Sequence, residues 1–152
     1  MKFKFHNTDR YASCGAVAIG TVLGENSFDI ERKIIKYRQK HPPNLNDYIV
    51  LSNWREDRSI TFFEEAIHFV RPFIGKNKVE TPTKRMRLLD LVCTVLNPNY
   101  IYMVMTKDHI QIVHDYKVWD TVSRRNDINA HIWNKRPVIK YIRLNKTGVK
   151  TK

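Results

Sequence analysis

The sequence has 152 residues, 42% of them apolar and 11% aromatic, which suffices for one hydrophobic core and argues against a disordered chain. The formal net charge of +12 predicts attraction to polyanions, yet the basic residues form no helix-turn-helix, zinc-finger or RNA-binding signature. No stretch reaches the roughly 18 apolar residues of a transmembrane helix and residues 1–10 lack the apolar core of a secretory signal, so we expect a cytoplasmic protein without membrane contact.

Helical patterns fill the first two thirds of the chain. Residues 1–5 alternate charged and aromatic side chains, which predicts a short edge strand followed by a polar loop. The run from Cys14 to Gly24 is small and apolar, which predicts a central helix buried on nearly all sides, with Ser13 as its N-cap. Amphipathic patterns predict three more helices, over residues 28–39, 60–70 and 83–96.

The last third of the chain changes to the pattern of strands. β-branched and aromatic residues predict strands over residues 100–105, 109–113, 117–119 and 138–144, joined by short turns. Short turns make the sheet antiparallel, so the expected fold class is α+β, with the apolar helix packed on the sheet. We expect one domain over residues 1–145 and a flexible basic tail over residues 146–152.

The two cysteines stand in different surroundings. Cys14 opens the apolar helix, where unpaired amides and the helix dipole stabilise a thiolate, so it is the candidate nucleophile. The alternative is that Cys14 is merely the first small residue of a buried helix. Cys93 lies within an apolar helical pattern and is expected to be a buried, unreactive thiol, and we expect no disulfide between the two.

His109 is the histidine with the best setting for a general base. It begins a predicted strand, and a two-residue turn at Asp115-Tyr116 would place Val113 opposite Val118 and bring Asp120 diagonally next to His109. A slip of one residue would separate the two side chains onto opposite faces. The other histidines are interpreted as loop, turn or isolated residues, with His68 and Glu64 too few to predict a metal site: His6, His41, His68, His114 and His131.

Taken together, these motifs resemble the papain-like cysteine peptidase superfamily, nearest to small bacterial members such as the leader-cleaving peptidase domains of bacteriocin exporters. The likeness rests on residues 10–18 (RYASCGAVA), 108–113 (DHIQIV) and 118–121 (VWDT) and extends over about residues 6–144. It implies a papain-like fold with Cys14, His109 and Asp120 as a catalytic triad. The family usually carries a Gln some six residues before the nucleophile to complete the oxyanion hole; here Thr8 stands there, and Asn7 is the best substitute.

The expected function is hydrolysis of a peptide or isopeptide bond, without cofactor or metal; acyl transfer and deamidation would use the same residues. One alternative is a catalytically inactive papain-like domain that acts as a basic effector, binding nucleic acid or an acidic protein. Another is a plain α+β nucleic-acid-binding protein, and nonspecific contact with nucleic acid is compatible with the charge. A compact basic chain of this kind would suit a phage or a mobile element.

Overall fold

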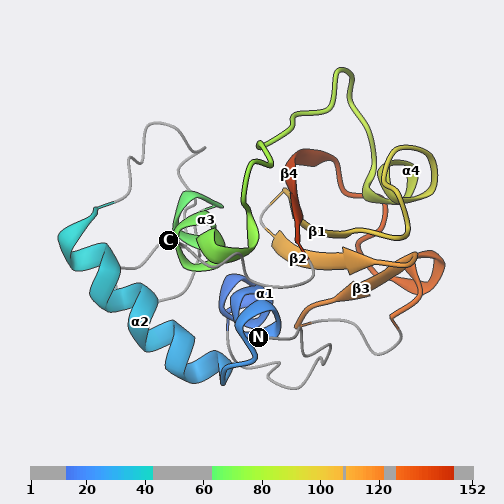
Figure 1. Ribbon diagram of the computed structural model, residues 1–152. Coiled ribbons are helices and arrows are strands. Elements are labelled where there is room, and N and C mark those ends of the chain that lie inside the picture. The colour runs from blue at the N-terminus through green and yellow to red at the C-terminus, as the bar shows by residue number, and fades with distance from the viewer. Residues whose placement is uncertain (1–12, 43–62, 108, 122–125, 146–152) are drawn as a thin grey trace.

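The fold is taken from a computed structural model, which describes residues 13–42, 63–107, 109–121 and 126–145. Four α-helices and one antiparallel sheet of four strands make up this part of the chain (Figure 1). The predicted α+β class is confirmed. The predicted strand over residues 1–5 and the basic tail over residues 146–152 lie outside the described residues.

Helix α1 (Cys14–Leu23) is the predicted apolar helix, and both of its ends are formed as expected. The hydroxyl of Ser13 accepts a hydrogen bond from the backbone N–H of Ala16 at 3.1 Å, and Gly24 ends the helix with a positive φ of 69°. Residues 15–22 are buried throughout, as an apolar helix without a polar face requires.

Helices α2 (Ser27–Lys40) and α3 (Phe63–Val70) pack against α1, and a 3₁₀ turn (Arg71–Phe73) follows α3. Gly20 permits the close approach of the α1–α2 connection, because a Cβ there would lie 2.7 Å from the carbonyl oxygen of Glu25. A buried, two-pronged ion pair joins α2 to α3, with Arg38 donating to both carboxylate oxygens of Glu65.

Helix α4 (Leu88–Thr94) is shorter than the predicted helix over residues 83–96. The residues just before α4 pair instead with the start of the last strand, where the N–H of Val138 donates to the carbonyl oxygen of Met86 at 2.8 Å. The prediction that Cys93 is buried was wrong, because its side chain is exposed. Only a narrow stripe of α4 is covered, formed by Leu88, Leu91 and Val92, and Cys93 falls beside it.

The sheet has the strand order β3-β2-β1-β4, and all neighbouring strands are antiparallel: β1 (Ile101–Thr106), β2 (His109–His114), β3 (Lys117–Trp119) and β4 (Val138–Leu144). The predicted register of the β2–β3 hairpin is confirmed, since Val113 lies opposite Val118. Its turn residues, Asp115 and Tyr116, both have positive φ, as a two-residue turn with the right twist requires.

Each face of the sheet carries its own hydrophobic cluster, and helices cover both faces (Figure 1). Alternate residues of β1 separate the two: Met103 joins the cluster of α1, α2 and α3, while Val104 joins that of α4. A short 3₁₀ helix, η3 (Ile128–Ala130), adds Ile128 to the α4 side. The expected packing of α1 on the sheet is therefore confirmed, chiefly against β2. None of the helices in the described ranges is long and apolar enough to cross a membrane.

Candidate active site

Cys14 occupies the first position of α1, at the end of the helix where backbone N–H groups have no partner within the helix. Ser13, the preceding residue, is held by two hydrogen bonds. Its hydroxyl caps α1, and its backbone N–H donates to a carboxylate oxygen of Glu31 on α2 at 3.1 Å. The body of the helix is buried against β2. The sulfur is thus held in place at the positive end of a rigid helix.

His109 begins β2, opposite Thr106 of β1, and is almost fully buried. Its Nε2 lies 2.7 Å from Oδ2 of Asp120, the residue that follows β3. The contact between His109 and Asp120 predicted from the hairpin register is therefore confirmed. Since a carboxylate accepts, Nε2 of His109 carries the proton of this bond, which leaves Nδ1 for a second partner.

The other partner of His109 is Cys14, since the two side chains lie close enough for each to shift the pKa of the other. Burial on its own raises the pKa of the Cys14 thiol, but the hydrogen bond and charge of His109 and the N–H groups of Ile110 and Gly15 outweigh it, so that the pKa lies below its usual range. Burial lowers the pKa of His109, yet its hydrogen bonds to Asp120 and Cys14 raise that pKa to about 9. At neutral pH these shifts favour a thiolate beside an imidazolium.

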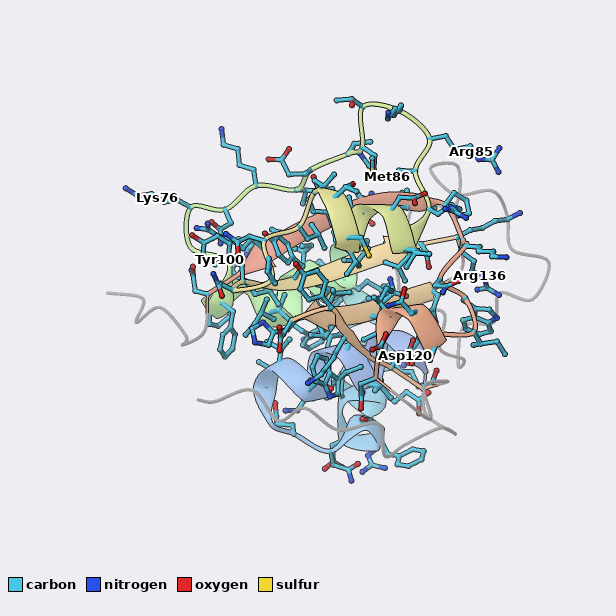
Figure 2. The ribbon with its side chains drawn as sticks, turned by 90° about the vertical axis from the view of Figure 1, so that its right-hand side faces the viewer. Lys76, Arg85, Met86, Tyr100, Asp120 and Arg136 are labelled. Atoms are coloured by element: carbon cyan, nitrogen blue, oxygen red, sulfur yellow. The ribbon has the colours of Figure 1, made fainter. Side chains whose placement is uncertain are left out.

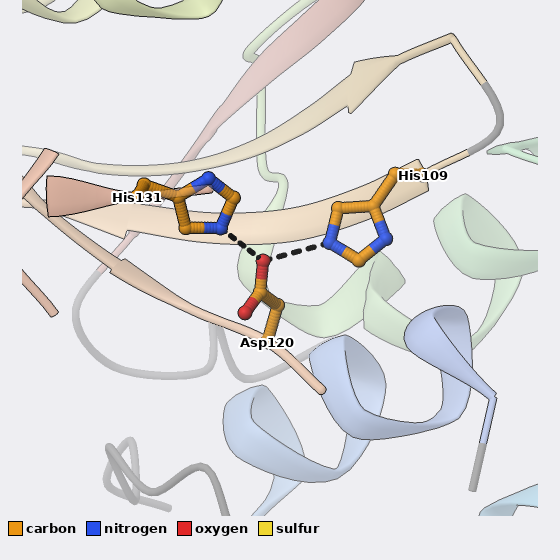
Figure 3. A group of neighbouring side chains, drawn as sticks. All are labelled: His109, Asp120 and His131. Carbon is orange, nitrogen blue, oxygen red and sulfur yellow. Dashed lines mark hydrogen bonds and ion pairs between the residues drawn. The ribbon is translucent and has the colours of Figure 1, made fainter. Parts of the chain in front are cut away.

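His131 is a member of this cluster that the sequence did not indicate. Its Nε2 lies 2.7 Å from the same oxygen of Asp120 that His109 contacts, so that Asp120 stands between two imidazole rings (Figure 3). The backbone N–H of Trp133 donates to Nδ1 of His131 at 3.2 Å, which fixes the tautomer with the proton on Nε2. Interpreting His131 as an isolated residue was wrong. No local pattern marks it, because η3 and its following turn bring it to Asp120 only in the folded chain.

An aromatic side chain closes the site on one side. The ring of Trp133 packs with its edge against His109, with the ring centroids 4.8 Å apart. The guanidinium of Arg136 lies 3.7 Å from the centroid of the Trp133 ring. Water is thereby kept from part of the His109 imidazole, which strengthens its hydrogen bonds.

His109, Asp120 and His131 also form a group that could hold a metal ion, since one ligand atom of each lies within 4.8 Å of the others. Two observations favour hydrogen bonding instead. Each histidine nitrogen is 2.7 Å from the shared oxygen, whereas two ligands on a tetrahedral zinc ion would be about 3.3 Å apart. Both nitrogens also point at a single oxygen atom, which is the arrangement of two donors on one acceptor.

The remaining candidates from the sequence do not join this cluster or lie outside the described residues. His68 stacks on Tyr37, with ring centroids 4.2 Å apart, and His41 also stacks on Tyr37, at the same distance. His114 meets the carbonyl oxygen of Tyr100 at 3.0 Å. Asn7, the expected oxyanion donor, lies outside the described residues.

Comparison with known proteins returns no match from family models, from curated proteins or from solved structures. The function of the chain is therefore inferred from its side chains and their geometry alone.

Proposed function

We propose that this protein is a papain-like cysteine hydrolase that cleaves a peptide or isopeptide bond, with Cys14 as nucleophile and His109 as acid and base. The observation that carries the proposal is the sequence of neighbours Cys14, His109 and Asp120, in which Cys14 and His109 shift the pKa of one another and His109 is bonded to Asp120. These residues come from α1, β2 and the end of β3, and structural packing alone gives no reason for a thiol, an imidazole and a carboxylate to meet in this order.

The proposed reaction begins with the Cys14 thiolate attacking the carbonyl carbon of the scissile bond. The first-turn N–H groups of α1 stabilise the negative charge that develops on the carbonyl oxygen. His109 gives its proton to the leaving amine as the C–N bond breaks, which leaves a thioester on Cys14. His109 then takes a proton from water, which attacks the thioester; the C–S bond breaks, the carboxylic acid product leaves, and the Cys14 thiolate beside the His109 imidazolium is restored.

Asp120 and His131 act behind the base in this proposal. Asp120 engages Nε2 of His109, which leaves Nδ1 for the sulfur of Cys14, and its charge stabilises the imidazolium. His131 is a positioning residue, because it donates to the same carboxylate oxygen and limits its rotation. The proposed machinery is therefore a row of four side chains.

A second candidate is a catalytically inactive domain that acts by binding, supported by the net charge of +12. The lowered pKa of Cys14 favours the enzyme, since a binding domain has no use for a stabilised thiolate beside a buried imidazole. Acyl transfer to an amine remains a variant of the same chemistry, with an amine in place of water.

The direct test is digestion of a proteome-derived peptide library, read by mass spectrometry, with the unmodified protein, Cys14→Ala and Cys93→Ala. We expect new peptide termini with the unmodified protein and with Cys93→Ala, and none with Cys14→Ala. EDTA should leave the cleavage unchanged, since no step involves a metal ion.

Alkylation by iodoacetamide provides a readout that needs no substrate. Cys14 should react at neutral pH faster than the exposed Cys93, and His109→Gln should abolish that advantage. Equal rates at both cysteines, together with no cleavage of the library, would leave the binding domain as the better proposal.

A further inference from the structure

Three segments that are joined to one another beside the site carry four basic side chains: Arg85, Lys107, Lys135 and Arg136. We call this set the basic rim. Arg85, Lys107 and Lys135 are exposed, and Arg136 is half-buried. Figure 2 shows Arg85 and Arg136 toward the same end of the molecule, with Lys76 at the opposite end.

Backbone contacts hold the three segments of the basic rim together. Arg136 donates from its guanidinium to the carbonyl oxygen of Lys107 at 3.2 Å, and the N–H of Lys107 donates to the carbonyl oxygen of Pro137. Arg87, two residues after Arg85, pairs with Pro137 in an isolated β-bridge. The fold therefore brings together the three segments that carry these charges.

The basic rim adjoins the proposed active site through one aromatic ring. Arg136 stacks on Trp133, and Trp133 packs against His109. Between His131 and Trp133 lies Ile132, which is 72% exposed, the largest exposed fraction among the apolar side chains that the structure describes. A chain bound at His109 would thus meet an apolar side chain and then a group of positive charges.

The charges of the basic rim are not neutralised by carboxylates within the described residues. The neighbouring Arg87 is paired with Asp90 at 2.7 Å, which shows that the same surface does form ion pairs where an acid is present. Asp108, the residue next to Lys107 in the sequence, contributes one negative charge against the four positive charges of the basic rim. Clustered like charges repel one another in the free protein, and an acidic ligand would relieve this repulsion.

We propose that the basic rim binds an acidic stretch of the protein substrate next to the bond that Cys14 cleaves. This inference rests on the proposed function. A peptide is favoured over nucleic acid because the rim is continuous with Trp133 and the exposed Ile132, and because a peptide offers Cys14 the amide bond that the proposed reaction cleaves.

Binding of a fluorescent oligoglutamate peptide tests the basic rim without any need for catalysis. The test variant is Arg85→Gln, Lys107→Gln and Lys135→Gln combined; Arg136 is left in place because it stacks on Trp133. The matched control removes three exposed charges elsewhere, with Lys40→Gln, Lys76→Gln and Lys78→Gln combined. We expect the test variant to weaken binding about tenfold and the control less than twofold.

A second readout links the basic rim to Cys14. Iodoacetate carries a negative charge and iodoacetamide none, so the ratio of their alkylation rates at Cys14 reports the local potential. The test variant should lower this ratio about threefold relative to the control. If the alkylation ratio and the peptide affinity change equally in the test variant and in the control, the proposed role of the basic rim is wrong. The proposed function would still stand in that case if Cys14 remains reactive.

Competition with an oligonucleotide tests whether the partner of the basic rim is a peptide. A single-stranded oligonucleotide of matched charge should compete with oligoglutamate only weakly. If the oligonucleotide binds more tightly, and the test variant alone loses that binding, the basic rim is a nucleic-acid surface and the peptide proposal is wrong.

Discussion

Asp120 and His131 are joined by a hydrogen bond of 2.7 Å in a part of the molecule where neither side chain has measurable exposure. His109 contacts the same carboxylate oxygen at the same distance. A carboxylate buried without donors would be costly, and two imidazole N–H groups on one oxygen reduce that cost while fixing its direction. The orientation of His109, the proposed base, therefore depends on His131, the residue that directly follows η3.

Replacing His131 by Phe should lower the rate of Cys14 alkylation or peptide cleavage about tenfold to a hundredfold at neutral pH, the equivalent of one charge-assisted hydrogen bond. With its second donor gone, Asp120 is less well held against His109, so the pKa of His109 should fall below about 9. The measurement is the rate of peptide cleavage as a function of pH, whose decline at alkaline pH should move to lower pH.

The conservative variant His131→Gln separates positioning from packing, since a carboxamide N–H can still donate to Asp120. We expect it to recover a part of the rate and of the alkaline limb. If both variants lose thermal stability equally while the pH profile of the folded fraction stays that of the unmodified protein, His131 has only a structural role.

The pKa shifts of Cys14 and His109 predict how alkylation of Cys14 and cleavage of a substrate depend on pH. Because the pKa of Cys14 is lowered, its thiolate persists as pH falls below the range of an ordinary thiol, near 8.5. Because the pKa of His109 is raised to about 9, the imidazolium that the leaving group needs is present below that pH and is lost above it. Cleavage should therefore show a plateau around neutral pH and decline as pH rises through about 9.

His109→Gln provides the reference for this profile. It removes the cation and should return the midpoint of Cys14 alkylation toward the ordinary range, near 8.5. Should the midpoint be the same in His109→Gln and in the unmodified protein, the imidazole does not stabilise the thiolate.

Features encoded by neighbouring residues could be predicted from the sequence. Ser13 and Gly24 mark the ends of α1 because capping depends on a few adjacent residues. The contact between His109 and Asp120 could be predicted because a two-residue turn at Asp115-Tyr116 sets the register of the hairpin.

Features that depend on tertiary packing could not be predicted from the sequence. His131 reaches Asp120 through an irregular segment whose sequence has neither the period of a strand nor that of a helix. Cys93 was expected inside because the helix is apolar on several sides, but α4 buries only the stripe of Leu88, Leu91 and Val92. Which face of a helix is covered depends on its neighbours, and these come from distant parts of the chain.

Asp120→Asn tests the charge of the carboxylate apart from its shape. The amide oxygen can still accept from His109 and His131, so the side chains should stay in place. Losing the negative charge lowers the pKa of His109, and we expect a tenfold to hundredfold loss of Cys14 alkylation at neutral pH. Asp120→Ala should lose more, since it removes the acceptor as well. A rate for Asp120→Asn equal to that of the unmodified protein would show that the charge has no role.

The buried pair of Arg38 and Glu65 should be important for the stability of the helical layer rather than for the reaction. Both side chains are at most 5% exposed, so Arg38→Met leaves Glu65 as a buried carboxylate without this partner and should lower the free energy of unfolding by about 3–5 kcal/mol. The double variant Arg38→Met with Glu65→Leu should recover most of that loss, because well-packed apolar side chains can replace a buried ion pair.

The exposed pair of Lys33 and Glu25 is the matched control, since Lys33→Met removes a cation from the same helix at a cost below about 1 kcal/mol. Urea unfolding measures all three variants, with iodoacetamide reactivity of Cys14 as a check on the site. A loss for Arg38→Met no larger than for Lys33→Met would mean that α2 and α3 are held together by their apolar contacts alone.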